Sequence, residues 1–334
     1  MGYAPTPRRA SVFGFLTRGR QLPRRCRRGF SIEGDPSPHH SSLNLLPHTL
    51  YNLRFVFDSD FAYALDPRAS HRDRMKLRPG IELSSQSDIG CLRKNNEDSF
   101  GYWEPDDDHQ FLRKGRLAVV ADGMGGYEGG QEASRLAVET LMASYRDFVG
   151  NDPQAALIEA LQAAHEQIRQ YSFAHPELRG MGTTCTAAAI VHSAGKDAPS
   201  EFLYFVHVGD TRLYLIRDGQ ITRVTRDHSY VGRLVEAGMI SAEEAEHHPQ
   251  RNILTAALGT NPDLIMDSPA HPERLQPEDV LLICSDGLWG QVRDPEILHA
   301  VDSNSAEKAG HVLIDLARER GGPDNITVEI LRLL

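Results

Sequence analysis

The sequence predicts an α+β domain with a largely antiparallel sheet core over residues 81–334. Short apolar runs that end at glycine, proline or charged residues are typical of buried strands. Between them lie longer segments whose apolar residues recur at helical spacing. The elements come as strands, then helices, then strands again, an order that favours an α+β fold over alternating parallel units.

The individual elements follow from local patterns. Strands are expected at 81–87, 99–103, 117–121, 183–191, 202–208, 212–217, 221–225, 280–284 and 326–331, and helices at 129–148, 152–172 and 306–318. Asp152 can cap the second helix, with Pro153 in its first turn. Asp218-Gly219 predicts a hairpin between two strands. The polar segment 229–262, with scattered Gly and Pro, is expected to be a partly helical insertion packed against the main body.

Charge divides the chain into two parts. Residues 1–80 contain 14 Lys and Arg against 6 Asp and Glu, and residues 81–334 contain 22 against 40. The acidic balance of the larger part argues against nucleic acid as its main partner. We expect residues 1–80 to be a basic, disordered extension. An organelle transit peptide, a flexible tail and sequence upstream of a true start at Met75 all remain open.

Two further observations concern the cellular setting. No apolar run approaches the ~20 residues of a membrane span. The cysteines Cys26, Cys91, Cys185 and Cys284 are dispersed without CxxC spacing, which favours buried thiols in a reducing compartment over a disulfide framework or a zinc site. We therefore expect a cytoplasmic protein.

Aspartates stand beside Gly or Asn where predicted strands begin or end. They are Asp98, Asp122, Asp286 and Asp324, and Asp210 is a fifth. Several carboxylates held at one rim of a sheet would repel each other unless cations neutralised them. Oxygen ligands without Cys or clustered His select Mg²⁺ or Mn²⁺. A single Asp-Gly pair is best explained as a turn, so the repetition is what favours a metal centre.

The stretch Ala121-Asp122-Gly123-Met124-Gly125-Gly126 carries the most chemistry. Its glycines would let the backbone approach a ligand closely and would place a peptide carbonyl beside Asp122. The alternative is a tight strand-to-helix turn with an exposed aspartate.

Six motifs occur in a specific order along the chain. They are Arg93-Lys94-Asn95-Asn96-Glu97-Asp98, Ala121-Asp122-Gly123-Met124-Gly125-Gly126, Met181-Gly182-Thr183-Thr184, Val208-Gly209-Asp210-Thr211-Arg212, Cys284-Ser285-Asp286-Gly287-Leu288 and Gly322-Pro323-Asp324-Asn325-Ile326. Over residues 81–333 this order and spacing resemble the PP2C (PPM) family of metal-dependent serine/threonine phosphatases, in its compact bacterial form. The resemblance implies a four-layer α-β-β-α sandwich, with two antiparallel sheets face to face and the metals at one end.

The resemblance also implies a set of metal ligands. Asp122 would bridge two Mn²⁺ or Mg²⁺ ions, and the carbonyl of Gly123 would bind one of them. Asp286 and Asp324 would complete the shell of that ion, and Asp98 would bind the other.

Three more residues have implied roles. Glu97 would act on the second ion through a water molecule, and Asp210 would bind a third, weaker ion. Arg93 would grip the substrate phosphate, because a planar guanidinium can form paired charge-assisted bonds. A surface arginine in a loop is the plainer alternative for Arg93.

The implied reaction is direct attack on phosphorus by a hydroxide held between the two ions, without a phosphoenzyme. The proton donor to the leaving group stays open, because Met124 and Tyr127 stand where some relatives carry a histidine. His228 is the nearest candidate by motif, although a structural role at the start of the next segment is the favoured interpretation. Residues 229–262 match the position of the family's mobile flap, which governs substrate access.

We therefore expect a monomeric phosphatase that acts on phosphoserine and phosphothreonine proteins and counteracts a bacterial Ser/Thr kinase. A catalytically silent, phosphoprotein-binding module on the same fold is the alternative. It is disfavoured because Asp98, Asp122, Asp286 and Asp324 are all present. A nucleotide-binding loop over residues 123–130 is disfavoured as well, because the chain lacks the Lys-Ser/Thr of a P-loop there.

Overall fold

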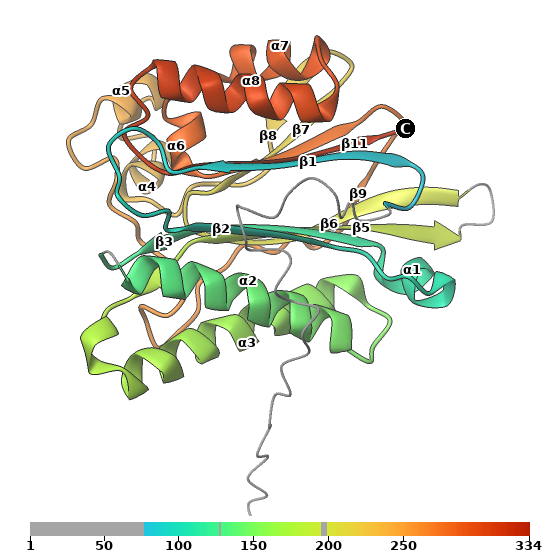
Figure 1. Ribbon diagram of the computed structural model, residues 1–334, viewed down its shortest axis with the longest axis horizontal. Helices are drawn as coiled ribbons and strands as arrows, with labels where there is room; N and C mark the ends of the chain where they lie inside the picture. Colours follow the sequence, from blue (N-terminus) through green and yellow to red (C-terminus); the bar gives the residue numbers. More distant parts are fainter. Residues whose placement is uncertain (1–76, 127, 195–198) are drawn as a thin grey trace, which may run out of the picture. The chain divides into compact units, whose positions relative to one another are not determined.

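The computed structural model describes residues 77–126, 128–194 and 199–334 (Figure 1). These residues belong to one of the two units into which the chain divides, residues 57–334. The predictions made for residues 1–76 lie outside the described residues. Within the described ranges, no helix is both long enough and apolar enough to cross a membrane.

Two antiparallel sheets form the centre of the domain. The first has the spatial order β1 (Ile81–Asp88), β11 (Ile326–Leu333), β10 (Val280–Cys284), β7 (Arg212–Arg217) and β8 (Gln220–Arg223). The second has the order β2 (Asp98–Trp103), β3 (Arg116–Met124), β5 (Cys185–Ala194), β6 (Pro199–Val208) and β9 (Glu273–Arg274), with the short β4 (Gly182–Thr183) paired to β3.

Helices cover the outer face of each sheet (Figure 1). The helices on the side of the second sheet are α2 (Gly129–Asp147) and α3 (Pro153–Ala174). Those on the side of the first sheet are α6 (Asp286–Trp289), α7 (Asp294–Asp302) and α8 (Ala306–Glu319). The remaining helices are α1 (Asp108–Lys114), α4 (Tyr230–Glu236), α5 (Ala242–Glu246) and the 3₁₀ turn η2 (Pro176–Leu178). This arrangement confirms the predicted α-β-β-α sandwich.

The central strands read as unbroken apolar runs because both of their faces are buried. In β10, Leu282 and Cys284 face the core beneath α7 and α8, whereas Leu281 and Ile283 face the core between the sheets. Successive side chains of a strand point to opposite faces, so each face of the run contributes to a different core. The run 117–121 in β3 divides in the same way between two cores.

The long helices form where their sequences predict them. The predicted apolar face of α2 is buried, and Leu141 and Tyr145 have no exposed surface. Asp152 caps α3 as expected, because its carboxylate accepts hydrogen bonds from the N–H groups of Gln154 (2.9 Å) and Ala155 (3.3 Å). The helix α8 buries small and apolar residues three and four positions apart, among them Ala309 and Leu313.

The structure contains short elements that were not predicted from the sequence. Among them are α1 and α7, which have seven and nine residues, and the still shorter α6 and β9. Elements this short do not show a clear repeat. β3 continues to Met124, so Asp122 and Gly123 lie within the strand instead of after it. The segment 229–262 contains only the short helices α4 and α5 and otherwise consists of turns and irregular chain.

The segment 229–262, called the flap below, is closed at its base. Ser229 pairs with Leu254 in an isolated bridge. The N–H of Thr255 donates to the carbonyl of His228 (2.7 Å), and the N–H of Tyr230 donates to the carbonyl of Ile253 (2.8 Å). The chain therefore enters and leaves this excursion at neighbouring points.

Candidate metal centre

Both sheets contribute aspartates to one rim of the sandwich. Asp98 begins β2 and lies opposite Asp122 of β3 in the antiparallel register. Asp286 follows β10 and begins α6, and Asp324 lies two residues before β11. The two sheets are joined here by the hydroxyl of Ser285, which donates to Oδ2 of Asp98 (2.7 Å). The predicted aspartates therefore meet across the gap between the sheets.

The ionisation of these side chains shows how close they are. Burial raises the pKa of Asp122 well above its ordinary value, and repulsion from Asp98, Asp286, Asp210 and Asp324 adds to this. Burial also raises the pKa of Asp98 to about 7 and that of Asp286 to about 6. The pKa of Asp210 is raised well above its usual range, first by burial and then by Asp286. Asp98 and Asp210 are thus buried, and Asp122, Asp286 and Asp324 are half-buried near them, a grouping of carboxylates that a cation would stabilise.

The chemistry of the donors fits hard divalent cations. The Oδ1 atoms of Asp98 and Asp286 are buried and accept no hydrogen bond from any described residue. A buried, unpartnered carboxylate oxygen is costly, and a cation is the ligand that would satisfy it. The donors are all oxygens, the type that Mn²⁺ and Mg²⁺ prefer.

The ligands do not already surround one point. Among the described residues, no three His, Cys, Asp or Glu side chains are arranged as a ready metal cluster. Two of the carboxylates are engaged with other groups instead. The carboxylate of Asp98 accepts a hydrogen bond from Ser285, and that of Asp324 accepts one from Arg93. Small rotations of these side chains would be needed for them to bind a metal.

Arg93 lies at the open side of the cluster. Its Nη2 donates to Oδ2 of Asp324 (2.6 Å), and 47% of its side chain is exposed. Burial lowers the pKa of its guanidinium, but attraction to Asp324, Glu97 and Asp122 outweighs burial and raises the pKa overall. A guanidinium has five N–H donors, so donors remain for an anion that approaches from solvent.

Glu97 is held by backbone contacts beside Gly123. Its carbonyl accepts a hydrogen bond from the N–H of Gly123 (3.0 Å), and burial raises the pKa of its carboxyl group. A Cβ atom on Gly123 would overlap the carbonyl oxygen of Gly130, and one on Gly130 would overlap the carboxylate of Glu97. These glycines therefore allow β3, α2 and the loop before β2 to pack closely.

The backbone around Asp122 is fixed by two threonines of the motif 181–184. The N–H of Asp122 donates to Oγ1 of Thr184 (3.0 Å), and its carbonyl accepts from Oγ1 of Thr183 (2.8 Å). Beyond Met124 the chain turns through Gly125 (φ 128°) and Gly126 (φ 78°), a left-handed region that favours glycine. The glycine stretch thus bends the chain out of β3 toward α2.

The side chains of Trp289, Arg212 and Asp227 form a cluster, called the clamp below, that contacts the backbone of Asp210. The indole N–H of Trp289 donates to the carbonyl of Asp210 (2.9 Å). The guanidinium of Arg212 lies 3.6 Å from the centroid of the Trp289 ring and forms a two-point ion pair with Asp227 (2.7 and 3.1 Å). Because Trp289 and Asp286 share helix α6, this clamp joins two of the predicted ligands.

His228 lies at the base of the flap. Its Nδ1 accepts a hydrogen bond from the N–H of Gly209 (3.3 Å), and its Nε2 lies 3.5 Å from Oδ1 of Asp267. The ring packs against His207, with centroids 5.0 Å apart. These contacts support the structural role preferred for His228 over a role as proton donor.

Three polar residues at the rim were missed by the sequence analysis. The hydroxyl of Ser285 donates to the carboxylate of Asp98 and accepts from the N–H of Thr327 (3.0 Å). The side-chain amide of Asn325 donates to the carbonyls of Ile89 and Asn95 (2.9 Å each) and accepts from the N–H of Glu97 (2.8 Å). Asn325 thereby fixes the loop that carries Arg93. Ser285 and Asn325 each stand beside a predicted ligand in the sequence. Their positions could therefore have marked them as candidate site residues.

Comparisons with known proteins agree with this fold. Residues 94–312 match the family model described as protein phosphatase 2C. The chain is 38% identical over 253 residues to the serine/threonine protein phosphatase PstP of Mycobacterium tuberculosis, covering 75% of this chain and 44% of that protein. It is 35% identical over 248 residues to the serine/threonine phosphatase stp of Listeria welshimeri, covering 73% of this chain and 92% of that protein.

A solved structure shows the same fold with metal bound. The crystal structure of the catalytic domain of PstP in complex with two manganese ions has a TM-score of 0.63 and 35% sequence identity. The match covers 76% of this chain and 99% of that chain.

Proposed function

The chain belongs to the protein phosphatase 2C family, and we propose that it removes phosphate from phosphoserine and phosphothreonine residues of proteins with the help of Mn²⁺ or Mg²⁺. The observation that carries this proposal is the group of buried and half-buried aspartates from both sheets, in which Asp98 and Asp286 each keep a buried, unpartnered oxygen. The guanidinium of Arg93 stands beside them.

The proposed ligands follow the arrangement of the rim. Asp122 and the Gly123 carbonyl lie on β3, and Asp286 and Asp324 come from the opposite sheet. Together with Asp98 they would hold two ions, with Glu97 acting through water. Asp210 would serve a third, weaker site. When bound, the ions would activate a water molecule for direct attack on phosphorus and offset negative charge on the phosphoryl oxygens.

The residues of the chain itself would position the substrate. Arg93 would exchange its contact with Asp324 for paired hydrogen bonds to the phosphate, which fixes the orientation of the phosphorus atom. Asn325 and Gly123 hold the loop of Arg93 and Glu97 against β3, so the guanidinium stays near the aspartates. No side chain of the described residues is assigned as proton donor to the leaving alkoxide.

The biological role proposed here is to reverse the action of a bacterial Ser/Thr kinase, with the protein acting as a cytoplasmic monomer. The names of the relatives support the serine/threonine class. The chain spans less than half the length of PstP, so this role is proposed for the phosphatase domain.

Hydrolysis of p-nitrophenyl phosphate and of a phosphothreonine peptide tests the proposal directly. We expect activity with Mn²⁺, loss of activity with EDTA, and recovery when Mn²⁺ is restored. An inactive protein that still binds the phosphopeptide in a pull-down would instead favour the catalytically silent module.

A further inference from the structure

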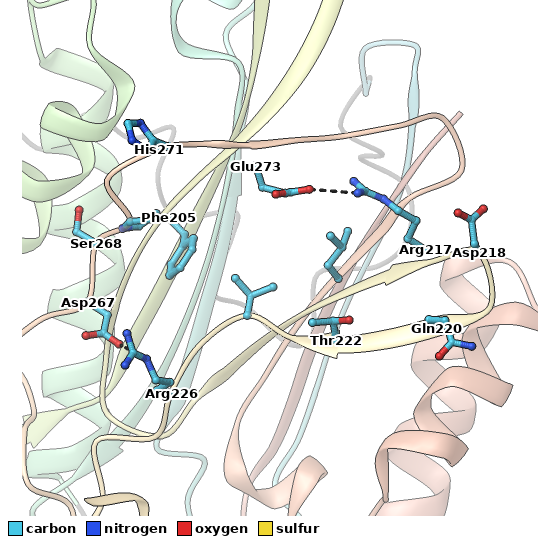
Figure 2. A pocket seen from close by; sticks show the side chains of 13 residues that line it. Phe205, Arg217, Asp218, Gln220, Thr222, Arg226, Asp267, Ser268, His271 and Glu273 are labelled. Carbon is cyan, nitrogen blue, oxygen red and sulfur yellow. Dashed lines mark hydrogen bonds and ion pairs between the residues drawn. The ribbon is translucent and has the colours of Figure 1, made fainter. Parts of the chain in front are cut away.

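A groove opens at the edge where both sheets end. β8 is the last strand of the first sheet and β9 the last of the second, and no strand of the described residues pairs with their outer edges. Between them lies a cavity of about 770 Å³, shown in Figure 2 and called the edge groove below. Its walls come from β6, β7, β8 and residues 267–273, and none of the five aspartates of the candidate metal centre lines it.

The floor of the edge groove is apolar. Leu215 of β7 lies opposite Thr222 of β8 in the strand register, and both line the groove. Phe205 of β6 lines the groove from the other sheet, on the opposite side from Thr222 (Figure 2). Phe205, Leu215 and Val224 pack against the core between the sheets but are only partly buried. An apolar side chain of a partner would complete their burial.

Carboxylates outnumber guanidiniums among the residues that line the groove, where Asp218, Asp267 and Glu273 stand against Arg217 and Arg226. At the hairpin end, Arg217 pairs with Asp279 (2.7 Å) and Glu273 (3.1 Å), and Asp218 adds a third acid. At the other end, Arg226 lies 3.7 Å from Glu236 and 3.9 Å from Asp267. Each arginine is thus already matched by acids, and the excess negative charge would attract a basic partner.

The groove is continuous with the candidate metal centre along the chain. Arg226 lines the groove, and the next residue, Asp227, holds the Arg212 guanidinium that stacks on Trp289. His228 follows and contacts Gly209, the neighbour of Asp210. Only Asp227 and His228 therefore lie between Arg226, at one end of the groove, and the loop of Asp210.

We propose that the edge groove binds an extended segment of the phosphoprotein substrate that carries basic and apolar side chains and lies some distance from the phosphorylated residue. This inference rests on the proposed function and adds a preference among substrates. The unpaired edges of β8 and β9 offer backbone groups to such an extended chain, the apolar floor takes an aliphatic or aromatic side chain, and the acids take Lys or Arg.

The test compares three substrates of the full chain: p-nitrophenyl phosphate and two phosphothreonine peptides that differ only in basic or acidic flanks. Peptides of about 20 residues reach roughly 30 Å on either side of a central phosphothreonine. We expect kcat/KM to be about tenfold higher for the peptide with basic flanks. Equal values for the two peptides would overturn the proposal.

Matched variants locate the effect. Gln220→Arg places a cation in the groove, and Gln162→Arg makes the same change on the exposed face of α3. Gln220→Arg should lower kcat/KM for the basic peptide about fivefold through KM and leave p-nitrophenyl phosphate unchanged. Asp218→Asn, which the left-handed turn (φ 51°) tolerates, should have a smaller effect of the same kind.

Two outcomes with the variants would also overturn the proposal. One is Gln220→Arg behaving like Gln162→Arg on all three substrates. The other is an equal loss for Gln220→Arg on p-nitrophenyl phosphate and on the basic peptide, because the change would then act on the catalytic centre. A wild-type protein that fails to hydrolyse p-nitrophenyl phosphate would contradict the proposed function itself, which is a separate result.

Discussion

The middle of the sandwich and its aspartate rim both contain buried carboxyl oxygens, but the hydrogen bonding of these oxygens differs. Glu329 of β11 lies fully buried between the sheets, and burial raises its pKa to about 8. Both of its oxygens have partners: Oε1 accepts from Ser85 (2.8 Å) and Oε2 from the N–H of Val119 (3.1 Å). At the rim, Asp98 and Asp286 each keep a buried oxygen that accepts no hydrogen bond from the described residues.

The difference separates a carboxyl group that serves the fold from carboxylates that are suited to a ligand. Glu329 can stay protonated near neutral pH and join β11 to β3 across the core. The rim aspartates crowd one another, so the protein without metal carries repulsion there that bound cations would remove. A raised pKa alone does not identify a functional site, whereas a raised pKa with unsatisfied oxygens does.

The largest expected effect comes from removing one rim charge. Asp122→Asn keeps the shape of the side chain but should lower Mn²⁺-dependent hydrolysis of p-nitrophenyl phosphate at least about a thousandfold. It should also raise the melting temperature measured in EDTA, because one source of repulsion is gone. Calorimetry with Mn²⁺ alone should show weakened binding. If this variant bound Mn²⁺ with wild-type affinity, Asp122 would not be a metal ligand.

Replacing Arg93 should have the next largest effect. Arg93→Ala removes the guanidinium beside Asp324, and we expect KM for p-nitrophenyl phosphate to rise about tenfold or more, because the phosphate loses charge-assisted bonds. Arg93→Lys restores the positive charge but lacks the paired N–H donors of a guanidinium. It should therefore recover only part of the lost phosphate binding. Unchanged kinetics in both variants would place Arg93 outside the site.

Glu329→Gln tests the role of the buried carboxyl group of the core through its effect on the free energy of unfolding. The pKa of Glu329 is higher in the folded protein (about 8) than its ordinary value of 4.5, so the folded state binds the proton more tightly. Stability is therefore lost as pH rises from about 4.5 through 8. Between pH 5 and pH 9 the variant should gain about 1–3 kcal/mol in free energy of unfolding relative to wild type.

Urea unfolding at pH 5, 7 and 9 measures this difference. Glu159→Gln on the exposed face of α3 is the control and should show no such pH trend. Parallel stability curves for wild type and Glu329→Gln would show that Glu329 is ionised equally in both states.

The smallest effect concerns the clamp behind Asp210. Trp289→Phe retains an aromatic ring for Arg212 but removes the N–H donated to the Asp210 carbonyl. The Mn²⁺ concentration needed for half-maximal activity should rise about threefold to tenfold, with little change in kcat at saturating metal. Calorimetric titration of the weakest Mn²⁺ site provides a second readout. Trp103→Phe, at the chain's other tryptophan, should leave both values unchanged.

Local patterns predicted most of the fold. The apolar runs of β3 and β10 marked buried strands, and the spacing in α2, α3 and α8 marked their helices. The pairing of strands was less accessible, because it joins distant parts of the chain: Ile81 of β1 lies opposite Leu333 of β11. No local pattern encodes such a contact, so the sandwich itself was predicted through the family resemblance.

The charged residues at the rim were singled out from the sequence, whereas its hydroxyl and amide residues were not. Asp98, Asp122, Asp286 and Asp324 stood out because carboxylates recur beside the ends of predicted strands, although any one of them alone would be explained as a turn. Ser285 and Asn325 have equally good explanations as turn or cap residues, so their contacts with Asp98 and Glu97 could be seen only in three dimensions. The open edge between β8 and β9 also gives no signal in the sequence, because it depends on where each sheet stops.

The closed base of the flap has a consequence for how the domain can vary. Because Ser229 and Leu254 are bridged, the residues between them can be lengthened, shortened or exchanged without moving β7, β8 or the Asp210 loop. The entropic cost of a longer loop grows slowly, by about 0.6 kcal/mol for each doubling of its length. Related chains can therefore change what borders the candidate metal centre by insertion or deletion, while the rim aspartates keep their positions.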